Sequence, residues 1–148
     1  MPWRRRGSRA HGGRQKRAHP NGMPSRGERA LFDRLVVEAL ETIPEPFRSR
    51  LHNVAIVAEE EPSRALLESL GMGPGDTLFG LYDGIPLTER GDWYNLVQPD
   101  RIILFRRPIM AACESVEEIR EEVRRTVVHE IAHFYGIGDE ELHRMGLD

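Results

Sequence analysis

The sequence predicts a single α+β domain, and two patterns carry this prediction. Apolar residues recur at helical spacing in residues 25–43 and 115–134, while short β-branched runs bounded by glycine and proline lie between them. The chain has 148 residues, which is enough for one domain and too few for two comfortable ones. We therefore expect one folded domain over residues 25–148.

Residues 1–24 differ sharply from this domain in composition. Of the 21 basic and 24 acidic residues of the chain, eight basic and no acidic residues lie in the first 26, which leaves 13 basic and 24 acidic residues and a charge of −11 for the rest. The segment is rich in Gly and Pro and nearly lacks aliphatic residues, so we predict a disordered basic tail. The tail is either a nucleic-acid-binding arm or an unstructured extension. A third interpretation is a misplaced start codon, with Met23 as the true first residue.

The chain shows no membrane span and no means of forming an internal disulfide. No apolar run approaches the roughly 18 residues that a span needs, and no apolar stretch follows the first arginines as a secretory signal requires. Cys113 has no second cysteine to pair with, which favours a reducing compartment. We expect a cytoplasmic protein without a membrane partner; its oligomeric state is not predicted.

The first element is a helix that begins at Ser25. Ser25 and Glu28 have the spacing of a capping box, and apolar residues follow at helical spacing as far as Ile43. Pro44 and Pro46 end the helix, because proline lacks the backbone N–H that a helix interior requires.

Short strands and one short helix follow in the middle of the chain. The β-branched residues 53–58 predict a strand, and Pro62 opens a helix that runs to Leu70 and ends at glycines. Residues 77–82 and 85–88 flank a two-residue Asp-Gly turn and predict a hairpin. Pro86 places the second of these strands at a sheet edge, and residues 100–105 predict a further strand.

The longest helix precedes the C-terminus. Ser115 and Glu118 form a second capping box, and an apolar stripe continues to Phe134. Gly136 marks the end of the helix, because glycine readily adopts the left-handed conformation that terminates helices. Cys113, just before this helix, is expected to be a small buried residue.

A metal-ligand pattern lies within this helix, in the sequence His129-Glu-Ile-Ala-His133. Histidines four residues apart share one helix face, with Cβ atoms about 5–6 Å apart, so both imidazoles can bind one Zn²⁺ at about 2.0–2.1 Å. Glu130 is rotated about 100° from His129. It therefore points beside the metal, where it can reach a water molecule rather than the ion.

A catalytic zinc site requires a third protein ligand. Asp139 is the best-spaced candidate, provided that Gly136 turns the chain back toward the histidines. Glu140, Glu141 and His143 remain as alternatives, because few residues follow His133.

The pattern His129-Glu-x-x-His133-x-x-Gly136-x-x-Asp139 resembles the extended signature of the zincin metallopeptidases in which Asp replaces a third histidine. The wider sequence resembles a small bacterial group of minimal zincins over roughly residues 27–148. The matching pieces are Leu78–Tyr82, Gly84–Thr88, Asp100–Ile102, Phe105–Arg106, Thr126–His129 and Leu142–Gly146.

The resemblance implies a fold and a set of site residues. The fold is zincin-like, with a small mixed β-sheet packed on the N-terminal helix and on the long zinc-binding helix. His129, His133 and Asp139 would bind one Zn²⁺ per chain, and Glu130 would be the general acid and base. The longer relatives have a C-terminal subdomain with a methionine turn. Met145 is expected to be an apolar contact of the terminal helix rather than that turn.

These residues predict a zinc-dependent hydrolase that cleaves peptide bonds of a peptide or protein substrate. Glu130 would assist the attack of a zinc-bound water on the peptide carbonyl. One alternative is a non-catalytic zinc-containing module that binds peptides. Another is a metal-dependent RNA-processing hydrolase. The charge of −11 disfavours this alternative, because it would repel a phosphate backbone. We therefore expect nucleic acid to contact at most the basic tail. Tyr82, Tyr94 and Tyr135 are candidate donors to a tetrahedral intermediate.

Overall fold

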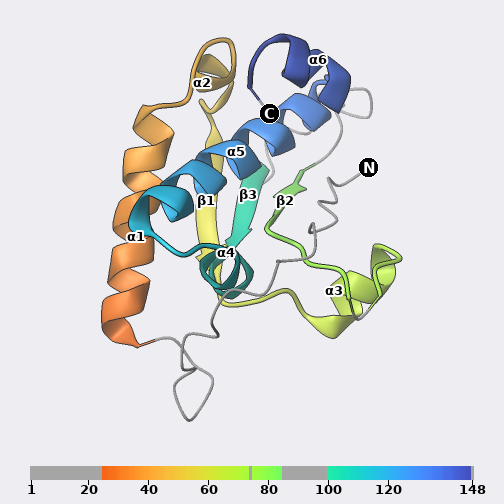
Figure 1. Cartoon of the computed structure of the whole chain (residues 1–148). Coiled ribbons are helices and arrows are strands. Elements are labelled where there is room, and N and C mark those ends of the chain that lie inside the picture. The colour runs from red at the N-terminus through yellow and green to blue at the C-terminus, as the bar shows by residue number, and fades with distance from the viewer. Residues whose placement is uncertain (1–24, 74, 85–99, 148) are drawn as a thin grey trace.

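The computed structural model describes residues 25–73, 75–84 and 100–147, and it confirms the α+β class (Figure 1). The elements of these residues are α1 (Arg26–Glu41), α2 (Phe47–Arg50), β1 (Val54–Glu59), α3 (Arg64–Ser69), β2 (Gly80–Asp83), β3 (Asp100–Phe105), α4 (Arg106–Ala112), α5 (Val116–Phe134) and α6 (Asp139–Arg144). The tail 1–24 and the strand 85–88, both predicted from sequence, lie outside the described residues. No helix in the described part is both long enough and apolar enough to cross a membrane.

Strand β3 is the centre of a three-stranded mixed sheet with the order β1-β3-β2. β1 pairs with β3 in parallel and β2 pairs with β3 antiparallel, so that Ile102 lies between Ile56 and Tyr82. Residues 102–105 are all buried, as expected for a strand that is covered on both faces. The prediction of a small mixed sheet is confirmed.

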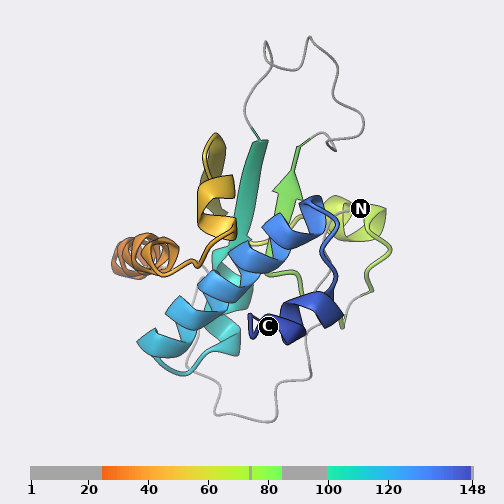
Figure 2. The ribbon, with the colours of Figure 1, turned by 90° about the horizontal axis from the view of Figure 1, so that it is seen from above.

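The alternation of side chains along β3 divides the core into two parts. Ile102 and Leu104 belong to the larger cluster, which also contains buried residues of α1 and α5. Ile103 and Phe105 face the opposite side and belong to the cluster beside α3. Figures 1 and 2 show α1 and α3 on opposite sides of the molecule and α5 crossing the sheet diagonally. The sheet thus packs on the N-terminal helix and on the long helix, as expected.

The predicted helix starts are confirmed by their caps. The Ser25 side chain accepts a hydrogen bond from the Glu28 amide, and the Ser115 side chain accepts one from the Glu118 amide, each at 3.1 Å. α3 begins two residues later than predicted, because the Ser63 hydroxyl caps it by accepting from the Leu66 amide. These caps satisfy amides that have no partner within the helix.

Two short helices are absent from the sequence-based prediction. α2 carries Phe47, which is fully buried in the larger cluster, so tertiary packing stabilises a helix that is too short to form alone. α4 starts directly after β3, and Pro108 lies in its first turn, where a missing N–H removes no helical hydrogen bond. A proline here is therefore compatible with helix, although it usually signals a break.

Gly80 allows β2 to approach α5 closely. A Cβ atom at this position would lie 2.6 Å from Cγ2 of Thr126 and 3.2 Å from the carbonyl oxygen of Ile103. Real Cβ atoms do not come within 2.6 Å of another carbon, so a larger residue would force the helix and the strand apart. β2 and α5 are in contact in the fold, and Gly80 sets how near they lie.

We therefore expect Gly80→Ala to lower the free energy of unfolding by about 1–3 kcal/mol through overpacking. Adding Thr126→Ser, which removes the clashing methyl group, should restore part of that loss. Gly73→Ala is the matched control, because nothing lies within 4 Å of its Cβ position. Denaturant unfolding of the four proteins provides the measurement, and equal stability of Gly80→Ala and Gly73→Ala would contradict a close approach at Gly80.

Candidate metal centre

Helix α5 holds His129 and His133 on one face. Their rings are nearly parallel, with an angle of 14° between the planes and 6.3 Å between the centroids. His129 is buried, at 6% exposure, whereas 23% of the His133 side chain is exposed. The four-residue spacing thus places both imidazoles side by side at the surface end of a largely buried helix segment.

The turn after α5 brings Asp139 back to these histidines. Gly136 has a φ of +79°, the Gly136 amide donates to the His133 carbonyl, and the Ile137 amide donates to the Ala132 carbonyl at 2.8 Å. This pattern is a Schellman motif, which requires the left-handed residue that glycine supplies. α6 then begins at Asp139 itself. The sharp turn predicted at Gly136 is present.

Oδ1 of Asp139 lies 3.3 Å from Nε2 of His133 and 3.7 Å from Nδ1 of His129. The three side chains each offer one donor atom, and these atoms all lie within 4.8 Å of one another. Two donors on a tetrahedral Zn²⁺ lie roughly 3.4 Å apart, given metal–donor distances of about 2.0–2.1 Å. Two imidazoles and one carboxylate are also a ligand set that zinc accepts. The two distances to Asp139, 3.3 and 3.7 Å, lie near this separation, so the three side chains form a candidate zinc site.

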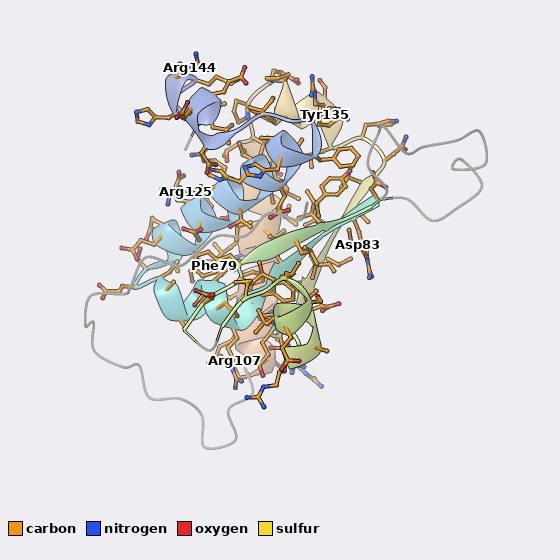
Figure 3. All side chains as sticks on the ribbon, turned by 90° about the vertical axis from the view of Figure 1, so that its right-hand side faces the viewer. Phe79, Asp83, Arg107, Arg125, Tyr135 and Arg144 are labelled. Carbon is orange, nitrogen blue, oxygen red and sulfur yellow. The ribbon has the colours of Figure 1, made fainter. Side chains whose placement is uncertain are left out.

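The alternative third ligands are placed differently. Glu140, Glu141 and His143 are exposed on α6, and none belongs to the group of donor atoms around the two histidines. Figure 3 shows α6, marked by Arg144, on one side of α5, and the segment from Phe79 to Asp83 along its other side. Among the described residues, Asp139 is the acidic group that the fold brings to both histidines.

Glu130 lies beside this group and is completely buried. Its Oε2 accepts a hydrogen bond of 2.7 Å from the backbone amide of Tyr82 in β2. Its Oε1 is also buried and has no hydrogen-bond partner among the described residues. Burial raises the pKa of the Glu130 carboxyl well above its usual range, and the Tyr82 amide offsets this only in part.

The tyrosine candidates differ in what their side chains contact. The Tyr82 hydroxyl donates to Oδ2 of Asp100 at 2.7 Å, so its proton is already engaged in this structure. Tyr135 is 38% exposed and its ring lies 4.0 Å beneath the guanidinium of Arg50. Tyr94 lies outside the described residues. The contacts of Tyr82 with Glu130 and Asp100 are absent from the sequence-based analysis, because no local pattern indicates them.

The structure also bears on the expectations for Cys113 and Met145. Cys113 is buried in the larger core cluster, as expected. Met145, expected to be an apolar contact of the terminal helix, is 41% exposed and belongs to neither core cluster of the described residues. Leu142 is fully buried in its place, and Leu147 packs against the same cluster.

The burial of Glu130 should reduce the stability of the metal-free protein at pH values above the usual pKa of a Glu carboxyl. The folded state binds the Glu130 proton more tightly than the unfolded state does, so stability falls as pH rises from the usual Glu pKa through the raised value. In chelator, Glu130→Gln should therefore raise the free energy of unfolding at neutral pH, because glutamine has the same shape and no charged form to remove from water.

This difference should vanish below about pH 4, where the carboxyl is protonated in both states. Glu121→Gln is the control, because the hydrogen bond with Arg124 lowers the pKa of the Glu121 carboxyl and its substitution should give no gain. Denaturant unfolding at several pH values tests this, and a Glu130→Gln protein less stable than the wild type at neutral pH would contradict it.

Comparison with known proteins identifies the family. No curated protein matches the chain. One solved structure, a conserved hypothetical protein from Thermo thermophilus, is similar at 24% identity and a TM-score of 0.47, with 79% of this chain and 98% of that chain covered. The model of the zincin-like metallopeptidases matches residues 51–147, more than half of the chain and all of α5 and α6. The chain therefore belongs to the zincin-like metallopeptidase family, which indicates a metal-dependent hydrolase.

Proposed function

We propose that this protein is a zinc-dependent peptidase in which His129, His133 and Asp139 bind the metal and Glu130 is the general base. The observation that carries the proposal is the meeting of three donor atoms within 4.8 Å beside a buried carboxylate. Family membership supports the use of zinc. Three protein ligands leave a fourth position open, which is typical of catalytic rather than structural zinc sites.

Bound Zn²⁺ supplies a Lewis acid that polarises a carbonyl and lowers the pKa of water to about 7. Glu130 accepts a proton from the attacking water as the water oxygen bonds to the peptide carbon. When the carbon–nitrogen bond breaks, Glu130 returns that proton to the leaving amine. A carboxyl with a raised pKa suits both steps, because it takes up a proton readily and still releases it.

The substrate is proposed to be an extended peptide that lies beside β2. In the described part of the chain β2 is the last strand of the sheet on the side of the metal centre, and the helix that carries both histidines contacts it. Backbone groups at a sheet edge can hold an extended chain. The strand 85–88, which we expected at this edge, follows β2 closely in the sequence but lies outside the described residues.

The charge near the site favours peptide over nucleic acid as substrate. The first turn of α6 contains Asp139, Glu140 and Glu141, which are all exposed. A phosphate backbone would be repelled by these carboxylates. Glu130 in turn favours an enzyme over a non-catalytic zinc-binding module. A buried carboxylate lowers stability, so its presence is better explained by a catalytic role than by folding.

Asp139→Ala should lose most of the bound zinc, because two histidines alone do not hold a catalytic zinc ion. Glu140→Ala is the matched control, since the neighbouring carboxylate is outside the donor group, and it should keep about one zinc per chain. Metal analysis of the purified full-length proteins gives the answer. Full zinc content in Asp139→Ala would assign the third ligand to another residue, with Glu140, Glu141 and His143 as the next candidates.

Glu130→Gln should keep its zinc while peptide hydrolysis falls by two or more orders of magnitude, roughly the contribution of a general base. Glutamine preserves the shape and accepts the Tyr82 amide but takes up no proton. Turnover is measured on an unbiased peptide library, with Glu121→Gln on the same helix as a control that should retain wild-type activity. Undiminished turnover in Glu130→Gln would exclude the proposed mechanism.

A further inference from the structure

We propose that Tyr82 is a positioning residue for Glu130, an inference that rests on the proposed hydrolase function. The Tyr82 amide anchors Oε2 of Glu130, which leaves Oε1 as the oxygen that takes up and releases the proton. The two oxygens of one carboxylate would thus have different roles. Their surroundings differ accordingly, since Oε2 accepts the Tyr82 N–H at 2.7 Å and Oε1 has no partner among the described residues.

The pairing of β2 explains why the Tyr82 amide is available to a helix side chain. In an antiparallel pair, residues alternate between those that exchange hydrogen bonds with the partner strand and those that do not. The Phe105 amide donates to the Phe79 carbonyl at 2.9 Å, and Tyr82 lies three positions further along the same register. The Tyr82 N–H therefore points away from β3, where Glu130 accepts it.

The Tyr82 side chain fixes the position of this amide. Its hydroxyl donates to Oδ2 of Asp100 at 2.7 Å, and Asp100 is buried at the start of β3. Its ring stacks on Phe134, with 4.2 Å between the centroids and 10° between the planes. Because Phe134 directly follows His133, one tyrosine connects the central strand, the general base and the end of the metal-binding helix.

Close contacts on both sides of Tyr82 limit how far β2 can shift. A Cβ at Gly80 would lie 2.6 Å from Thr126 of α5, and a Cβ at Gly84 would lie 2.6 Å from Cγ of Asp100. The strand is therefore seated against the helix before Tyr82 and against Asp100 after it. A strand held in this way presents its amide to Glu130 at a fixed point.

Oε1 of Glu130, for which the described part of the chain offers no hydrogen-bond partner, has the properties of the reacting atom. Buried polar atoms in folded proteins nearly always have a hydrogen-bond partner, and an exception indicates a water, a ligand or a catalytic role. A proton of the attacking water moves to Oε1 while the water oxygen bonds to the carbonyl carbon. The same proton then moves to the peptide nitrogen as the carbon–nitrogen bond breaks, which restores the carboxylate.

Amide hydrogen exchange tests the anchoring without zinc or substrate. In chelated full-length protein, Glu130→Ala removes the acceptor and should speed exchange of the Tyr82 amide by about tenfold or more. Glu130→Gln keeps an acceptor oxygen and should leave the amide protected. Exchange at Tyr82 that is the same in the wild type and in Glu130→Ala would overturn the anchoring.

Turnover tests the positioning. Tyr82→Phe and Asp100→Ala each remove one partner of the hydroxyl bond, and each should lower kcat by about tenfold with KM and zinc content unchanged. The double variant should be no worse than either single variant, because both act through one bond. Thr42→Val is the control, since it also removes one side-chain hydroxyl bond, to the Ala39 carbonyl at the end of α1, and it should keep wild-type turnover.

The two measurements separate failure of this inference from failure of the proposed function. A wild type that binds zinc but cleaves no peptide would refute the peptidase, while the exchange result would still decide whether Tyr82 anchors Glu130. Unchanged kcat in Tyr82→Phe with an active wild type would overturn the positioning role. Losses of zinc and of kcat together in Tyr82→Phe would also overturn it, because they would mark a structural residue.

Discussion

The close crossing of α5 over β2 is the constraint on which the rest of the site depends. It is possible because Gly80 has no side chain where Thr126 approaches. One helical turn after Thr126, the same crossing brings Glu130 within 2.7 Å of the Tyr82 amide, and one turn later it brings Phe134 onto the Tyr82 ring. A single short strand therefore holds the buried carboxylate and the end of the metal-binding helix, and any residue that widened the crossing would disturb both.

The proposed general base lowers the stability of the fold. A buried carboxylate destabilises the folded state, because its charged form has lost water and has gained, from the described residues, one hydrogen-bond donor. The surrounding core compensates with apolar packing: Val127, Val128 and Ile131, on either side of His129 and Glu130, are almost completely buried. Functional sites are where folded proteins retain such unfavourable groups.

The candidate metal centre, by contrast, is built almost wholly from one short stretch of chain. His129 and His133 share a helix face, and the left-handed Gly136 returns Asp139 to them within six residues of His133. No second long helix is needed to supply the third donor. The candidate ligand group is consequently local, whereas the proposed general base, Glu130, is bound by a residue that lies 48 positions earlier in the sequence. The candidate metal ligands and the proposed general base are thus positioned by different parts of the fold.

The sequence by itself determined the features that depend on neighbouring residues. The caps at Ser25 and Ser115, the strand at residues 100–105 and the turn at Gly136 follow from interactions within a few positions. Boundaries shifted where a single residue intervened, as at Asn53, whose φ of 66° keeps it out of β1. Only the tertiary structure decided that Tyr82 donates hydrogen bonds to Glu130 and Asp100, which are 48 and 18 residues away. Such contacts depend on strand pairing and on how a helix crosses a sheet, and local periodicity carries no information about either.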